Sequence, residues 1–260
     1  MKAFRGNGLE DDPLHPRGGN EESWWLRAFG LIPLDLQLPR LRQRPFQAKN
    51  QREHMTIELE SSLHQFKPDD FGSLHDFLST TDKDERDTLL IACSDHGTAP
   101  DNVSFAGTDR FLILQHLAEC VPPPEDRESN DLFGSIELGF SSNNLRHAIV
   151  CGHLSCGVIR NWLKDSIGPD IGGLQARFRS TVVKAVDETY PELTSRDYIE
   201  RLICEHALFQ LENLQMHPLI RERLDAKQLK LHLWIVNDQT ARILAYNPHI
   251  GDLVPIEEMR

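Results

Sequence analysis

The sequence has no run of 18 or more apolar residues, which excludes a membrane-spanning helix. It also lacks a surplus of basic residues: 28 Lys and Arg stand against 40 Asp and Glu, and the net charge is −12. A general nucleic-acid-binding protein needs a basic face, so this balance argues against one. The first seven residues contain no apolar stretch typical of a signal peptide. Five cysteines are few and odd in number, which favours a reducing compartment, and we expect the cytoplasm.

The first 52 residues differ in composition from the rest of the chain. They hold five of the fifteen prolines and nine Lys and Arg against six Asp and Glu. We therefore expect a Pro/Arg-rich N-terminal arm over residues 1–52 and one globular domain over residues 53–260. The arm is either mobile or docked on a partner subunit or another protein. Trp24 and Trp25 are costly to leave in water, which favours docking.

Strand and helix patterns alternate along the remaining sequence. Apolar runs predict strands over Thr88–Cys93, Arg110–Gln115, Arg146–Cys151, Lys230–Val236 and Ile243–Tyr246. Apolar residues at three and four spacing predict helices over Ile57–Phe66, Leu132–Phe140, Val158–Leu163, Phe178–Tyr190 and Tyr198–Met216. This order predicts an α/β fold, with a mainly parallel sheet of four to five strands flanked by helices.

Four possible metal ligands lie at the ends of two predicted strands. Cys93 and Asp95 follow one strand, and His153 and Cys156 follow another. The carboxyl ends of parallel strands meet at one edge of a sheet, where ligands collect. Two thiolates, one imidazole and one carboxylate form a ligand set that Zn²⁺ prefers. Any one of these residues alone is more often an ordinary buried side chain, but the four together favour a zinc site. The other three cysteines stand in apolar surroundings and are predicted to be buried thiols: Cys120, Cys151 and Cys204.

The sequence motifs around these residues resemble those of a known family. Cys93-Ser94-Asp95 and Gly152-His153-Leu154-Ser155-Cys156-Gly157 are similar to the Cys-x-Asp-x-Arg and His-x-x-Cys elements of the β-class carbonic anhydrases. The resemblance covers about residues 55 to 256. It implies a β-carbonic anhydrase-like fold and a catalytic Zn²⁺ held by Cys93, His153 and Cys156. It also implies CO₂ and bicarbonate as reactants, and a homodimer or higher homo-oligomer.

The fourth position on the zinc decides the function. Water there would give a zinc-bound hydroxide at neutral pH, and Asp95 there would close the site. In the resembled family the arginine of Cys-x-Asp-x-Arg holds the carboxylate away from the metal, but this chain has Gly97 instead. We therefore expect Asp95 to be either a displaceable fourth ligand or an acceptor of the hydroxide's proton. His96 is predicted to be either a proton shuttle or a solvent-facing loop residue.

Two further positions depart from the resembled family. Gln115-His116 stands where many members have Arg-Asn, and Asp84 stands where many have a substrate-binding glutamine. A divergent member is therefore expected. The leading hypothesis is a zinc-dependent lyase that hydrates CO₂ reversibly to bicarbonate. The alternatives are a catalytically silent zinc protein that serves in assembly or interaction, with Asp95 closing the site, and a hydrolase of a CO₂ analogue such as COS or CS₂.

Overall fold

The computed structural model describes residues 57, 59–60, 63–79, 86–95, 110–125, 131–164, 173–240 and 242–259. Its centre is a six-stranded sheet in the order β2-β1-β3-β4-β5-β6. The strands are β1 (Thr88–Cys93), β2 (Phe111–His116), β3 (His147–His153), β4 (Lys230–Asn237), β5 (Arg242–Asn247) and β6 (Asp252–Pro255). The first four strands pair in parallel, and β5 and β6 are antiparallel. This confirms the predicted α/β fold and its mainly parallel sheet, with β6 as an additional strand.

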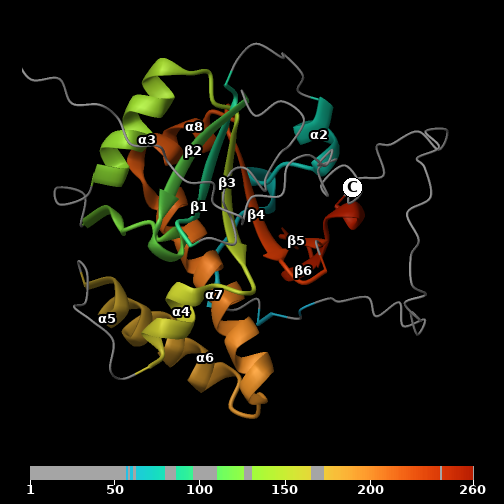
Figure 1. Ribbon diagram of the computed structural model, residues 1–260. Coiled ribbons are helices and arrows are strands. Elements are labelled where there is room, and N and C mark those ends of the chain that lie inside the picture. The colour runs from blue at the N-terminus through green and yellow to red at the C-terminus, as the bar shows by residue number, and fades with distance from the viewer. Residues whose placement is uncertain are drawn as a thin grey trace, which may run out of the picture.

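Helices flank the sheet, and those between residues 157 and 189 lie at the carboxyl ends of its parallel strands (Figure 1). They are α2 (Leu74–Ser79), α3 (Asp131–Ser142), α4 (Gly157–Trp162), α5 (Leu174–Phe178), α6 (Lys184–Thr189), α7 (Ser195–Met216) and α8 (Pro218–Asp225). A π-helical turn, Arg179–Val183, joins α5 to α6 without a break in the helical backbone, so the helix predicted over Phe178–Tyr190 is present and contains this turn. No helix among the described residues has the length and apolar character needed to cross a membrane.

Apolar side chains fill both faces of the sheet, because every residue of β1 and β3 is buried. Successive side chains of a strand point to opposite faces. Leu89 and Ile91 therefore join the larger core on the side of α7, and Leu90 joins a smaller core with Phe77 of α2. Burial on both faces explains why these strands read as nearly continuous apolar runs in the sequence.

The helix predicted over Ile57–Phe66 is absent from the described part of that segment. Ile57 instead pairs antiparallel with Leu253 of β6, and only Leu63 lies in a 3-10 turn. The main-chain N–H groups of this segment bond to distant side chains, which replaces the hydrogen bonds of a helix. The N–H of Leu59 bonds to Asp252, that of Glu60 to Tyr190 and that of Gln65 to Glu212. The predicted arm lies outside the described residues.

A buried charged network fastens this segment to α7. His64 Nε2 lies 2.7 Å from Glu205 Oε2, and its Nδ1 lies 3.2 Å from Glu212 Oε2. Tyr190 donates to the other oxygen of Glu205 at 2.7 Å. Burial by itself lowers the pKa of His64, but the two carboxylates outweigh it and raise the pKa to about 9. His64 is thus a buried cation at neutral pH, and it ties residues 63–66 to α7.

We expect this network to make stability depend on pH. The pKa of His64 is raised on folding from 6.5 to about 9, so its contribution is complete below about pH 6.5 and disappears as the pH rises past about 9. At ~1.4 kcal/mol per pKa unit, the free energy of unfolding should fall by roughly 3 kcal/mol across this range. Urea unfolding of the wild type and of His64→Gln, at several pH values with metal saturating, measures it. The decline should be missing in His64→Gln but kept in His75→Gln, which changes a histidine whose side chain is 85% exposed. Equal slopes in all three proteins would contradict the assignment.

Candidate metal centre

Three of the four predicted ligands converge at the carboxyl ends of β1 and β3. Cys93 ends β1, His153 ends β3, and Cys156 immediately precedes α4. One ligand atom from each lies within 4.8 Å of the others, and all three residues are buried. The strand predicted to end at Cys151 continues to His153, so the imidazole is placed by the sheet itself.

The spacing of the two sulfurs fits a tetrahedral zinc ion. Cys93 Sγ and Cys156 Sγ are 3.8 Å apart. Two thiolates that each lie ~2.3 Å from a tetrahedral zinc are separated by about 3.8 Å. Hydrogen bonding from Cys156 lowers the pKa of Cys93 to about 5 against the opposing effect of burial, and the same contact raises the pKa of Cys156. Together the pair readily carries one negative charge, and a divalent cation favours the loss of the second proton.

The ring of His153 is oriented for metal binding through Nε2. Its Nδ1 lies 3.1 Å from Ser155 Oγ and 3.5 Å from Asp238 Oδ2. Nε2 is buried and has no hydrogen-bond partner among the described residues. A carboxylate on one ring nitrogen fixes the tautomer that leaves a lone pair on the other, as in many zinc sites. The donor set and this unpartnered nitrogen therefore fit a zinc ion.

Asp95 lies beside the triad but is bound to the start of α4. Its Oδ2 accepts a hydrogen bond from Gly157 N–H at 2.5 Å, and the N–H of Asp95 points to Cys93 Sγ at 3.3 Å. The group of converging ligands does not include Asp95. A Cβ on Gly157 would lie 2.8 Å from Asp95 Oδ2, so glycine allows this close approach. His96, Gly97 and Asp84 lie outside the described residues.

Neither Arg110 nor Arg146 replaces the missing arginine, because neither lies near Asp95. Arg110 precedes β2 and binds Asp87 through a 2.6 Å ion pair. Arg146 precedes β3, and its backbone bonds to Asp87 and Lys230. Both therefore stand at the amino ends of strands, across the length of the sheet from the triad. Lys83 lies outside the described part of the chain.

A buried acid near the triad was not predicted. Glu119 is 1% exposed, and neither carboxyl oxygen has a hydrogen-bond partner within the described ranges. Burial raises its pKa well above the usual value, and the negative charge of Cys93 adds to the effect. Ala118 and Glu119 both have positive φ, and this turn directs the carboxyl toward Gly152, where a Cβ would lie 3.0 Å from Oε1. Nothing in the sequence indicated a left-handed turn at two non-glycine residues.

Asp238 was also missed, although a signal for it exists. It directly follows β4, at the same edge of the sheet as Cys93 and His153. The rule that ligands gather at strand ends applies to it as well. The three remaining cysteines are buried and free, as predicted: Cys120, Cys151 and Cys204.

Comparison with known proteins agrees with this geometry. The carbonic anhydrase family model matches residues 88–243, well over half of the chain. Carbonic anhydrase from Synechococcus elongatus is 25% identical over 205 residues, covering 77% of this chain and 75% of the relative. The enzyme from Synechocystis is 26% identical over 196 residues, covering 74% and 71%.

Solved structures show the same fold. The structure of the β-carbonic anhydrase CcaA has a TM-score of 0.58 at 26% identity, covering 70% of this chain and 90% of that one. A tetrameric β-carbonic anhydrase from Sordaria macrospora has a TM-score of 0.54 at 21% identity, covering 66% and 85%. The region that the family model matches contains the triad of Cys93, His153 and Cys156 at the strand ends. The chain therefore belongs to the β-class carbonic anhydrase family.

Proposed function

We propose that this protein is a zinc-dependent carbonic anhydrase that interconverts CO₂ and bicarbonate. The observation that carries the proposal is the convergence of Cys93, His153 and Cys156 in a chain of this family. His153 Nε2 is buried and has no hydrogen-bond partner in the part of the chain that the structure describes. Zinc bound to these three residues supplies a nucleophile at neutral pH, because it lowers the pKa of a bound water to ~7. Ser155 and Asp238 orient the imidazole.

We assign Asp95 the role of a fixed hydrogen-bond acceptor beside the metal. Its bond to Gly157 N–H supports this role over ligation of the metal, which the absence of arginine at position 97 had suggested. The peptide N–H at the start of α4 contributes to the restraint that an arginine side chain provides in other members. A carboxylate so held accepts the proton of the attacking water and orients its oxygen toward CO₂.

Asp95→Asn separates the two roles. The amide keeps the size of the side chain but loses the negative charge and most of the proton affinity. We expect the variant to retain one zinc per chain, while kcat for CO₂ hydration falls by roughly 10²-fold. Stopped-flow CO₂ hydration from pH 6.5 to 9, with elemental analysis of the same samples, measures both. Loss of zinc from Asp95→Asn would instead identify Asp95 as a ligand. Zinc-loaded wild type without activity at any pH would contradict the enzyme and favour the assembly protein.

We also propose that the chain forms a homodimer or a larger homo-oligomer. The tetrameric relative from Sordaria macrospora shares the fold and supports self-association. Light scattering of the zinc-loaded protein at several concentrations gives the number of chains. A monomer at every concentration would contradict the proposal.

A further inference from the structure

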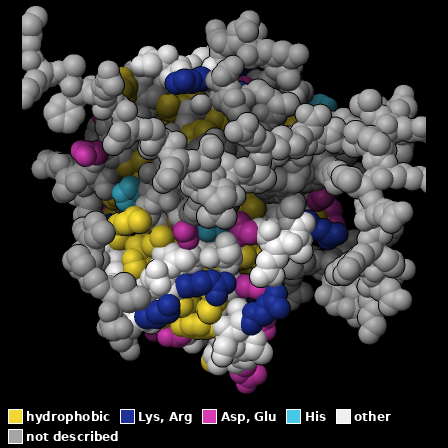
Figure 2. Space-filling model, in the orientation of Figure 1, with side chains coloured by type: hydrophobic (Ala, Val, Ile, Leu, Met, Phe, Trp, Pro, Cys, Tyr) yellow, Lys and Arg dark blue, Asp and Glu magenta, His cyan; other side chains and the backbone are white. Residues whose placement is uncertain are grey.

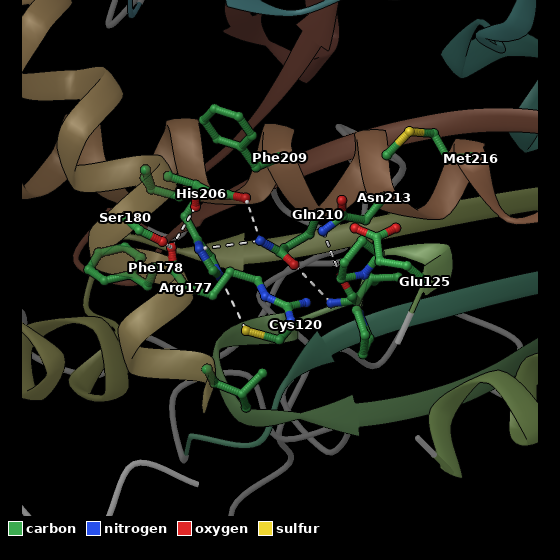
Figure 3. Close-up of a pocket in the computed structure, with 16 residues that line it drawn as sticks. Cys120, Glu125, Arg177, Phe178, Ser180, His206, Phe209, Gln210, Asn213 and Met216 are labelled. Carbon is green, nitrogen blue, oxygen red and sulfur yellow. Dashed lines mark hydrogen bonds between the residues drawn. The ribbon is translucent and has the colours of Figure 1, made fainter. Parts of the chain in front are cut away.

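A cavity of about 420 Å³ lies apart from the metal triad. It is enclosed by α5, the π-helical turn Arg179–Val183, α7 and the loop that follows Glu119 (Figure 3). None of the three converging ligands lines it. Its volume is within the range of pockets that bind small organic molecules, ~300–1,000 Å³. The family's reaction, as proposed above, makes no use of this space.

Hydrogen bonds between α7 and the loop hold one side of the cavity in place. Gln210 accepts from Val121 N–H at 2.9 Å, and Asn213 donates to Val121 O at 2.7 Å. One turn before Gln210 in α7, the ring of His206 donates a hydrogen bond to Ala118 O at 2.8 Å. These polar groups satisfy one another, so this wall is formed before any ligand arrives and requires little ordering on binding.

Arg177 supplies a cation inside the cavity. Its side chain extends from α5 into the space between Cys120 and Gln210 (Figure 3). Burial raises the pKa of the Cys120 thiol, and the positive charge of Arg177 opposes this increase. Arg177 is the only Lys or Arg among the described residues that line the cavity. Residues 173–190 carry three Lys and Arg against two Asp and Glu, whereas α7 carries two against four. Figure 2 shows Lys and Arg side chains gathered over the part of this face where α4, α6 and α7 lie.

The remaining lining determines what kind of anion fits. Phe178, Val182 and Phe209 offer an apolar surface, which suits a hydrophobic body. Glu125 stands at the exposed rim and would repel a second negative charge. The geometry points to a binding site for a small organic monocarboxylate, with its carboxylate on Arg177 and its apolar body between the π-helical turn and α7.

The test uses the zinc-loaded full-length protein and 4-(trifluoromethyl)benzoate, followed by ¹⁹F NMR. We expect saturable binding of one probe per chain. The neutral probe 4-(trifluoromethyl)benzamide should bind at least tenfold more weakly, because it loses the charge-assisted contact. Arg177→Met should weaken the benzoate by about tenfold or more, and Arg177→Lys by less. The matched control is Lys184→Met on α6, whose side chain is 67% exposed and does not line the cavity; it should bind as the wild type does.

One further variant and one competition experiment locate the probe. Ser180→Trp places a large side chain from the exposed wall into the cavity and should abolish binding with zinc content unchanged. Saturating bicarbonate should not displace the probe, because the metal triad is elsewhere. The proposal is overturned if binding is not saturable, if Arg177→Met and Lys184→Met weaken it equally, or if bicarbonate competes with the benzoate. Such competition would place the carboxylate on the metal.

Discussion

Replacing Cys93 with serine is expected to reduce bound zinc from one ion per chain to almost none and to abolish CO₂ hydration. Cys93 stands 3.8 Å from its partner sulfur and is fully buried at the end of β1. Zinc requires a deprotonated ligand, and a serine hydroxyl is not deprotonated near neutral pH. Two remaining protein ligands do not hold zinc against dilution, so activity should fall by at least ~10³-fold. Elemental analysis after gel filtration, with stopped-flow assays of the same fractions, measures the effect.

Cys151→Ser is the matched control for this prediction. Cys151 is 3% exposed and lies on the neighbouring strand, but its side chain belongs to the smaller core on the opposite face of the sheet. Both substitutions place a hydroxyl in the apolar interior and carry a similar cost in stability, ~1–3 kcal/mol. Only Cys93→Ser should lose zinc. If the two variants retain equal amounts of metal, the triad is not the zinc site.

Replacing Gly157 with alanine should reduce kcat by roughly 10³-fold while zinc remains bound. The added Cβ would lie 2.8 Å from Asp95 Oδ2, so either the carboxylate or the first turn of α4 must move. Gly157 has no positive φ, and alanine is therefore compatible with its backbone. The change displaces the acceptor that we assign to Asp95, and displacements of about 1 Å in a reacting group have large effects on rate.

Gly134→Ala tests whether alanine in a helix is harmless elsewhere in the protein. Gly134 lies in α3, where an added Cβ meets no atom within 4 Å. Alanine there should raise the free energy of unfolding by up to ~1 kcal/mol and leave kcat unchanged. A Gly157→Ala protein with wild-type activity would show that the position of Asp95 does not matter to the reaction. Loss of zinc in Gly157→Ala would place the effect at Cys156 instead.

The strands and the converging Cys and His side chains were largely predictable, because each leaves a local pattern in the sequence. A strand buried on both faces is a short apolar run, and β1 begins and ends where its run does. Cys93 and His153 stand at the ends of such runs, so their convergence follows from parallel pairing alone. The predicted helix over Ile57–Phe66 failed for the opposite reason. Its apolar spacing was compatible with a helix, but partners nearly 200 residues away, Asp252 and Leu253, bond to its backbone.

The sequence by itself determined the fold class, the central strands and the identity of the three converging side chains that we propose as zinc ligands, because these depend on local pattern and on one rule of sheet topology. Only the tertiary structure decided which groups surround them. Gly157 N–H reaches Asp95 because α4 begins beside the end of β1, and Asp238 reaches His153 because β4 lies next to β3. The cation at His64 depends on a non-helical segment that packs on α7, and the cavity at Arg177 depends on helices and a loop that pack together across long stretches of chain. Burial and proximity of this kind depend on packing in three dimensions, and the order of residues along the chain does not record them.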